Sequence, residues 1–341
     1  MVSDRSTLFL RSATALLALS ASVTAFPAGR FEERSGVGFF DDVLLFDAPA
    51  VLSDPPRIQI EAYTYLRQFD IDLGPLTDLF GGLFDGIDLG DIGEKAGNIA
   101  ERVKLLASIP RTGKQVEINI PGCGATKLTA TSNEIDGISI TDLSCAASLT
   151  GGAPIEAQVD LDSRGMTAKI FPSPIDGFGV ISDVDDTIKI SNVLNKLELI
   201  KNTFIEEPKA VAGMPELYAS LKTSLNDPLF SYISGSPFQL DKLNTYKHKV
   251  ATIDRLVNLY PQKKFLMIGD STEQDPEVYA EAFKRHATSV QCIWIRLVDG
   301  ADNSKERFAK TFDGVHGLKI RTFTDAETQS LQQIDVANGK C

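Results

Sequence analysis

The second half of the chain alternates short apolar runs with segments of helical periodicity, and this alternation constrains the fold more than any other feature. The apolar runs lie at 179–181, 229–233, 265–268 and 289–295, and the helical segments lie near 213–225, 246–260 and 276–286. Strands that alternate with helices build a parallel sheet covered on both faces. We therefore predict an α/β domain over residues 172–335, beginning at a Pro-Ser-Pro sequence.

The preceding part of the chain is rich in short strands. Residues 57–66 alternate apolar and polar positions, which is typical of a half-buried strand. Further strands are predicted at 116–120, 127–131, 137–143, 155–161 and 166–171. Strands at this spacing favour a smaller, β-sandwich-like domain over residues 35–171.

Two stretches of helical periodicity interrupt this strand-rich part, and we predict a helical insertion at 75–108. In the first stretch the charged positions are all aspartates. An interfacial helix carries basic residues on its polar face. The pattern therefore favours packing on the sandwich over lying on a membrane surface.

The first 25 residues have the pattern of a secretory signal peptide. Arginines flank the start, an apolar stretch covers 13–23, and Val-Thr-Ala at 23–25 is a small-residue cleavage site. The apolar stretch is shorter than the ~20 residues that span a membrane. We therefore expect a secreted, extracellular protein.

A secreted chain with four cysteines is expected to form disulfides. Four cysteines allow three pairings. We favour Cys123 with Cys145, each of which lies beside turn residues, and then Cys292 with Cys341. The spacing of the cysteines and histidines does not match a zinc site.

The formal net charge of −12 narrows the range of partners. A nucleic-acid binder needs a basic footprint, and electrostatic docking on anionic lipid needs clustered lysine or arginine. We therefore expect no nucleic-acid partner and at most transient contact with a membrane surface. An acidic chain that acts on a phosphate must supply cations within its site.

Acidic side chains follow two of the predicted parallel strands. Asp183 and Asp185 come directly after the run at 178–182, and Asp270 follows the run at 265–268, with Asp275 five positions further on. Ligands of α/β sheets bind at the carboxyl ends of strands. If the first strand continues, its two aspartates point to the same side, where they repel each other unless a cation is present. Oxygen ligands of this kind suit Mg²⁺; the alternative is an acidic turn with a helix cap at Thr187.

A hydroxyl and an ammonium complete the constellation. Ser234 directly follows the run at 229–233 and precedes Gly235. Lys249 lies in the helical segment 246–260, where Lys247 is an alternative. Paired carboxylates, a hydroxyl, a lysine and further acids fit covalent phosphoryl transfer, with a nucleophile, an acid/base, phosphate donors and metal ligands.

These motifs resemble those of the haloacid dehalogenase superfamily of phosphatases, and more narrowly the catalytic domain of the fungal actin-patch phosphatidate phosphatase family. The resembling segments are VISDVDDTIK at 180–189, SGSPFQL at 234–240, LMIGDS at 266–271 and DPEVY at 275–279. The resemblance covers roughly 172–330. It implies a Rossmann-like parallel sheet and Mg²⁺-dependent hydrolysis of phosphatidate or a related phosphomonoester, so that the partner is a phosphorylated lipid or a small phosphoester.

The resemblance also implies a role for each residue. Asp183 attacks phosphorus and becomes an aspartyl-phosphate, and Asp185 protonates the leaving oxygen and then activates water. Ser234 and the Gly235 amide hold phosphoryl oxygens. Lys249 offsets charge between the nucleophile and the phosphate.

The same resemblance implies the metal ligands. Asp183, Asp270 and the backbone carbonyl of Asp185 bind Mg²⁺, with Asp275 nearby.

The chain departs from the family in one segment and in its N-terminus. Only fourteen residues, 235–248, separate the motif serine from the lysine, whereas the family has a longer stretch there with a strand and loops near the substrate. Either lipid-recognising surface is missing or the gene model lacks an exon. The secretory signal also places the enzyme away from the cytosolic membranes associated with the family.

Two other functions are compatible with parts of the sequence. A GDS-type serine esterase would use Ser271 in Gly-Asp-Ser with His316 in Asp-x-x-His, because a triad requires a histidine within hydrogen-bond reach of the serine. Only 44 residues separate the two, too few for that fold. A secreted binding or cell-surface protein without activity is the other alternative, and loss of the acidic residues would indicate it.

Overall fold

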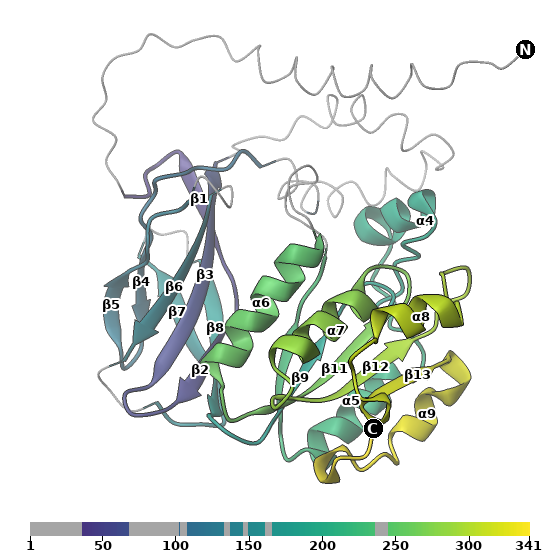
Figure 1. The fold of residues 1–341 in the computed structure, drawn as a ribbon. Coiled ribbons are helices and arrows are strands. Elements are labelled where there is room, and N and C mark those ends of the chain that lie inside the picture. Colours follow the sequence, from purple (N-terminus) through teal and green to yellow (C-terminus); the bar gives the residue numbers. More distant parts are fainter. Residues whose placement is uncertain are drawn as a thin grey trace, which may run out of the picture. The chain divides into compact units, whose positions relative to one another are not determined.

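The computed structural model describes residues 36–67, 102, 108–132, 137–145, 149–160, 166–235 and 245–341. The predicted signal peptide at 1–25 lies outside the described residues, as does the predicted helical insertion at 75–108 apart from Arg102 and Ser108. The described residues contain two sheets, one mainly antiparallel and one parallel (Figure 1).

The first sheet contains eight strands. They are β1 (Asp41–Leu45), β2 (Ala48–Leu52), β3 (Arg57–Leu66), β4 (Glu117–Ile120), β5 (Gly124–Lys127), β6 (Ile138–Ser144), β7 (Ile155–Val159) and β8 (Thr167–Pro174). The strand order is β1-β3-β2-β8-β7-β4-β5, and β6 pairs with β3. Every pair is antiparallel except β2 with β8. The strand-rich prediction is confirmed, but hydrogen bonds join all eight strands into one connected sheet.

One strand prediction in this part is wrong. The segment predicted at 127–131 is not a strand, and β5 lies just before it at Gly124–Lys127. The cause is a tight turn: the amide of Cys123 donates to the carbonyl of Ile120 at 2.9 Å, and Gly122 adopts a positive φ of 85°. The chain therefore reverses at once and β5 pairs with β4. The strands β1 and β2 were not predicted.

The second sheet is the parallel sheet that the sequence predicts. Its strands are β9 (Phe178–Ser182), β10 (Leu229–Tyr232), β11 (Lys264–Asp270), β12 (Val290–Arg296) and β13 (Ile320–Phe323). Their order is β10-β9-β11-β12-β13, and all four neighbouring pairs are parallel.

Helices connect these strands. They are α4 (Lys196–Ile200), α5 (Met214–Ser224), α6 (Thr245–Leu259), α7 (Asp275–Arg285), α8 (Lys305–Thr311) and α9 (Thr328–Leu331), with a π-helix at Lys201–Ile205 and 3₁₀ turns at Gly317–Lys319, Asp325–Glu327 and Val336–Asn338. Of the described helices, none has the length and apolar character needed to cross a membrane.

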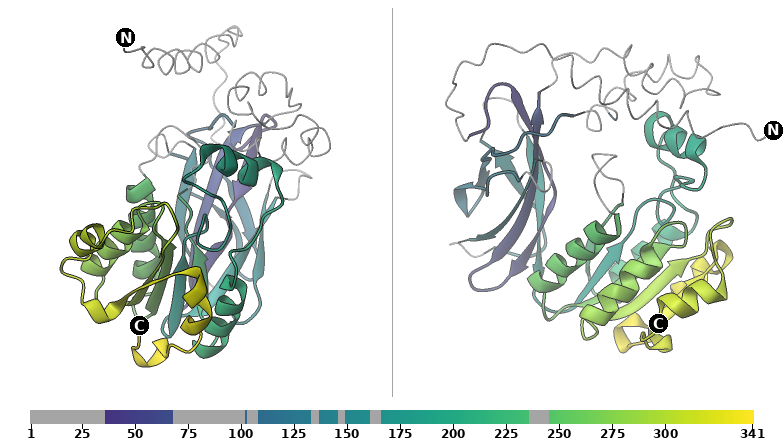
Figure 2. Two further views of the ribbon diagram at one scale, coloured as in Figure 1. Left: turned by 90° about the vertical axis from the view of Figure 1, so that its right-hand side faces the viewer. Right: turned by 45° about the horizontal axis from the view of Figure 1, so that its top comes forward.

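Apolar cores cover both faces of the parallel sheet. Ile181 of β9 packs with residues of α6 and α7, whereas its neighbour Val180 packs with residues of α5 and α9. This is the alternation expected of a strand buried on both sides, and Figures 1 and 2 show helices on both faces. The strand order places the carboxyl ends of β9, β10 and β11 side by side.

The expected start of the α/β part at residue 172 falls within a strand. β8 continues to Pro174, which pairs with Leu52 of β2. Both predicted disulfides are present. The Cα atoms are 4.9 Å apart in Cys123–Cys145 and 5.5 Å apart in Cys292–Cys341.

Candidate active site

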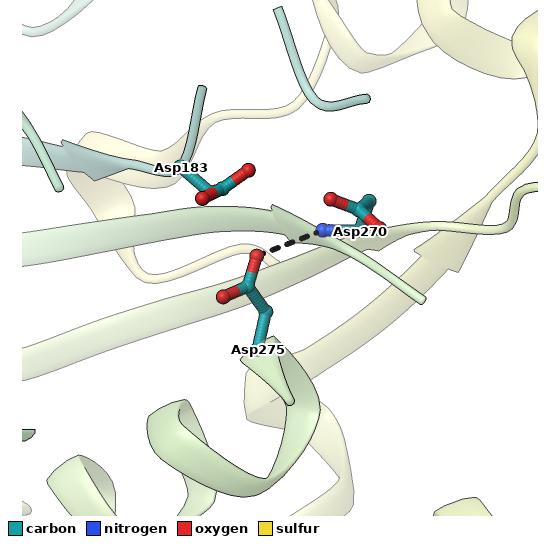
Figure 3. Close-up of side chains that lie close together, drawn as sticks. All are labelled: Asp183, Asp270 and Asp275. Atoms are coloured by element: carbon teal, nitrogen blue, oxygen red, sulfur yellow. Dashed lines mark hydrogen bonds between the residues drawn. The ribbon is translucent and has the colours of Figure 1, made fainter. Parts of the chain in front are cut away.

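Three buried carboxylates meet at the carboxyl edge of the parallel sheet. Asp183 directly follows β9, and its amide donates to the carbonyl of Ile268 in β11 at 2.9 Å. Asp270 is the last residue of β11, and Asp275 is the first residue of α7. Ligand oxygens of the three carboxylates lie within 4.8 Å of one another (Figure 3). This cluster of oxygen donors could hold a metal ion.

The absence of a side chain at Gly269 allows this approach. Asp275 Oδ2 accepts a hydrogen bond from the amide of Asp270 at 3.3 Å (Figure 3). A Cβ atom at position 269 would lie 2.5 Å from that same Oδ2 atom. Glycine is therefore required where the start of α7 meets the end of β11.

Lys249 of α6 provides positive charge inside the cluster. Its Nζ atom lies 2.7 Å from Asp183 Oδ1, 2.6 Å from Asp275 Oδ1 and 3.6 Å from Glu273 Oε2. Lys249 is buried, whereas Lys247 is exposed on the surface. Of the two lysines considered in the sequence, the structure therefore brings Lys249 to the carboxylates.

Burial and charge shift the protonation of these groups. Burial and the Asp275 carboxylate raise the pKa of Asp183 well above its ordinary value, against the opposing effect of Lys249. Burial and the same carboxylate raise the pKa of Asp270 to about 7. Burial lowers the pKa of Lys249, but Asp275 and Asp183 raise it by more, so that its net shift is upward. Such a cluster favours an additional cation.

Asp185 faces a different set of partners. Its Oδ1 atom accepts a hydrogen bond from the Ser191 hydroxyl at 2.5 Å and lies 3.4 Å from Lys189 Nζ. Its Oδ2 atom accepts from the Ser234 hydroxyl at 3.1 Å. The Asp185 carboxylate is therefore held at both oxygens, one of them by the serine at the end of the neighbouring strand β10.

The chain turns sharply between Asp183 and the residues that hold Asp185. β9 ends at Ser182, so the strand does not continue through Asp185, and the condition under which the two aspartates would point to the same side is not met. Asp186 adopts a positive φ of 56°, and its carboxylate accepts the backbone amides of residues 191–193 at 2.7–2.9 Å. Arg296 donates to the Asp186 carbonyl at 2.7 Å. This turn folds residues 189–191 back onto Asp185.

Ser234 and Gly235 closely follow β10, which ends at Tyr232. A Cβ atom at position 235 would lie 2.5 Å from Thr245 Cγ2 and 2.9 Å from Glu273 Oε2. Lys249 Cε would lie 3.3 Å away. Gly235 is therefore enclosed by the first turn of α6 and by the loop after β11, and a larger residue does not fit.

Several side chains at the site were not predicted from the sequence. Thr187 was considered only as a helix cap, but its hydroxyl donates to Asp270 Oδ2 at 3.1 Å. The amide of Thr272 donates to Asp270 Oδ1 at 2.6 Å. Glu273, Lys189 and Ser191 join the site through the contacts above. In the sequence, these residues are marked only by lying close to the motifs along the chain. That closeness does not show toward which group their side chains point.

The serine-esterase alternative finds no support in this geometry. Ser271 is fully buried, and its Oγ atom accepts the amide of Val298 at 3.0 Å. His316 accepts the amide of Leu318 through Nδ1 at 3.3 Å. Of the hydrogen bonds between described residues, none joins Ser271 to His316, as a triad would require.

Comparison with known proteins finds similar sequences for the region that carries the carboxylate cluster. The family described as "Phosphatidate phosphatase APP1, catalytic domain" matches residues 178–246 and 240–297. Phosphatidate phosphatase APP1 of Saccharomyces cerevisiae is 28% identical over 180 residues. That match covers 43% of this chain and spans 30% of the yeast protein. The part of the chain that carries the carboxylate cluster is thus related to the catalytic-domain family of phosphatidate phosphatase APP1.

Proposed function

We propose that this chain is a Mg²⁺-dependent phosphatase that hydrolyses the phosphomonoester of phosphatidate or a related phospholipid. The observation that carries the proposal is the position of Lys249 beside Asp183, with Ser234 on Asp185 and Asp270 at the end of the adjacent strand. These groups lie in the region related to the APP1 catalytic domain. The haloacid dehalogenase type of mechanism requires this set of groups, and the fold assignment to that superfamily is part of the proposal.

The proposed chemistry has two steps at Asp183 and Asp185. In the first, a carboxylate oxygen of Asp183 attacks phosphorus, the bond from phosphorus to the leaving oxygen breaks, and that oxygen takes a proton from Asp185. In the second, a water oxygen attacks phosphorus, its proton goes to Asp185, and the bond from phosphorus to Asp183 breaks. Inorganic phosphate leaves and both aspartates return to their starting states.

Ser234, Gly235 and Lys249 would bind the transferred group during both steps. The hydroxyl of Ser234 donates to Asp185 Oδ2 at 3.1 Å, and in the proposed mechanism it would turn from the carboxylate to a phosphoryl oxygen. The ammonium of Lys249 stays within hydrogen-bond distance of the nucleophile. Fixed donors that face developing negative charge are an effective source of rate enhancement.

The carboxylates fit the proposed Mg²⁺. All the ligand atoms in the cluster are carboxylate oxygens, which Mg²⁺ prefers and which suit Zn²⁺ less well than nitrogen or sulfur. Asp183 and Asp270 would hold the ion, with the Asp185 carbonyl beside them and Asp275 in the same cluster. When bound, the ion supplies positive charge that offsets the charge of the phosphate.

We also propose that the protein is secreted. The predicted signal peptide supports this location, and two disulfides are compatible with an oxidising compartment. Non-reducing peptide mapping of protein from the culture medium should recover Cys123 linked to Cys145. Recovery of all four cysteines as free thiols, from cells only, would contradict secretion.

The activity is tested by a phosphate-release screen of the purified full chain. Phosphatidate and soluble phosphomonoesters are supplied with Mg²⁺, with Zn²⁺ and with EDTA. The proposal predicts release with Mg²⁺, loss in EDTA and recovery on adding Mg²⁺ back. Full activity in EDTA would contradict the metal assignment, and absence of release from every substrate would contradict the phosphatase.

A further inference from the structure

We propose that a cavity beside Ser234 and Gly235 binds the acyl-chain end of the phospholipid substrate, an inference that rests on the proposed function. The cavity has a volume of about 930 Å³ and reaches both residues. Ligand pockets commonly measure ~300–1,000 Å³, so this cavity has far more room than a phosphate group requires. A substrate whose phosphate lies at Ser234 would have its leaving group next to this space, since Ser234 is part of the lining.

One wall of the cavity comes from the parallel sheet and α6. Tyr232 and Ile233 at the end of β10 line it together with Leu256 of α6. Tyr232 is 54% exposed, an unusually open position for an aromatic residue so close to the site. This wall therefore presents apolar surface directly beside the phosphate donors.

The opposite wall comes from the first sheet. Phe46, Pro49 and Phe171 contribute to it, and Phe171 is 38% exposed. Two hydrogen-bonding contacts join this sheet to the parallel-sheet part near the cavity: Arg57 Nη2 donates to the carbonyl of Leu259 at 3.0 Å, and Lys263 Nζ donates to Ser173 Oγ at 3.0 Å. The apolar side chains of the two walls therefore enclose one space.

Two ion pairs lie in the cavity lining, and the carboxylate of Asp47, which also lines it, accepts the amide of Lys169 at 2.7 Å. Arg255 Nη2 lies 3.6 Å from Glu61 Oε2, and both line the cavity. Lys222 lies 3.6 Å from Asp227 at another part of the lining. Burial, together with the Arg255 and Lys249 cations, lowers the pKa of His248, so that this lining residue is neutral at neutral pH. Walls of this kind suit an uncharged apolar group better than a second phosphate or a sugar.

Most of the cavity lining lies outside the shortened segment 235–248, which contributes Gly235, Thr245 and His248. The sequence departs there from the family that it resembles, yet the apolar lining residues named above come from β2 and the turn before it, from β8, from the end of β10 and from α6. A substrate with acyl chains should therefore be preferred to one with the same phosphate on bare glycerol.

The test compares dioctanoyl phosphatidate, which is soluble, with glycerol 3-phosphate. For the wild-type chain we expect kcat/KM to be higher for the dioctanoyl substrate. Phe171→Asp on one wall and Tyr232→Asp on the other should each lower the ratio of the two kcat/KM values by about tenfold or more, because a charge then faces the apolar group. Leu318→Asp is the matched control, since Leu318 is 78% exposed and does not line the cavity.

A binding measurement separates this inference from the proposed function. Calorimetry with dioctanoylglycerol, the product without its phosphate, should give binding to the wild-type chain and to Leu318→Asp, and weaker binding to both wall variants. Binding without any turnover would leave the cavity assigned and would overturn the phosphatase. Turnover with an unchanged substrate ratio in both folded wall variants would overturn the cavity assignment.

Discussion

Lys249 Nζ lies 2.7 Å from Asp183 Oδ1, and both side chains are 2% exposed. A buried ammonium in contact with a buried carboxylate is stable only while both partners remain. The pair joins the helix α6 to the end of strand β9, so the proposed nucleophile is positioned from two elements that are far apart in the sequence.

Replacing this lysine should damage both folding and activity. Lys249→Met leaves Asp183 and Asp275 without their cation, and we expect the free energy of unfolding to fall by about 3 kcal/mol. Phosphatase activity should fall ~100-fold or more. Lys247→Met is the control, and because Lys247 is exposed we expect a change within about 0.5 kcal/mol. Denaturant titration and phosphate release measure the two effects; the reverse order of the two variants would show that the wrong lysine has been assigned.

Gly269→Ala should lower activity without removing any reactive group. The new methyl would lie 2.5 Å from Asp275 Oδ2, so α7 must shift away from β11. A displacement of about 1 Å at a site of this kind costs ~100-fold in rate.

Gly317→Ala is the matched control, because a Cβ atom there has no neighbour within 4 Å. Thermal unfolding distinguishes a shifted site from an unfolded chain. Equal kcat values for the two alanine variants would show that the position of Asp275 does not matter.

The motif residues could be predicted from the sequence because strand ends fix their location. Asp183, Ser234 and Asp270 each follow an apolar run, and in a parallel sheet those runs end at one edge. Lys189 and Ser191, by contrast, reach the site through a turn that the hydrophobic periodicity of the sequence does not reveal. Asp186 adopts a positive φ and folds residues 189–191 back onto Asp185.

The strands, too, divide into those that the sequence predicts and those that it does not. Four of the five parallel strands, β9 to β12, were predicted because burial on both faces makes them continuous apolar runs. In the first sheet, β5 was misplaced because its residues are mostly exposed and its position is set by the turn at Gly122. β13 was also missed, since only Phe323 among its four residues is buried.

Stabilisation by Mg²⁺ should depend on pH. The pKa of Asp270 is raised to about 7, so between about pH 4 and pH 7 the folded chain without metal keeps a proton that the unfolded chain has released. Its stability therefore falls as the pH rises through this range and levels off above pH 7. A metal ion must displace that proton, so the rise in melting temperature on adding Mg²⁺ should be larger at about pH 8 than at about pH 5.

Asp270→Asn is the control for this effect. The substitution removes a charged ligand and the titrating group together, so both the Mg²⁺ shift and its pH dependence should shrink. Thermal unfolding with and without Mg²⁺ at each pH gives the result. A shift that is equal at the two pH values, or that persists unchanged in Asp270→Asn, would place the ion elsewhere.

Asp183 and Asp185 should fail in different ways when each is replaced by asparagine. An amide oxygen is too weak a nucleophile to attack phosphorus, so Asp183→Asn should lose turnover. An acid/base assists both steps, but p-nitrophenolate leaves without much protonation. With that substrate, Asp185→Asn should be slowed mainly in the hydrolysis of the acyl phosphate, giving a burst of product followed by a slow phase.

The most direct measurement is rapid-quench labelling of the wild-type chain and both variants with a ³²P-labelled phosphomonoester. The account predicts acid-stable, hydroxylamine-sensitive phosphoprotein that accumulates in Asp185→Asn and is absent from Asp183→Asn. Label on Asp183→Asn, or turnover by that variant at the wild-type rate, would contradict the assignment of Asp183 as the nucleophile.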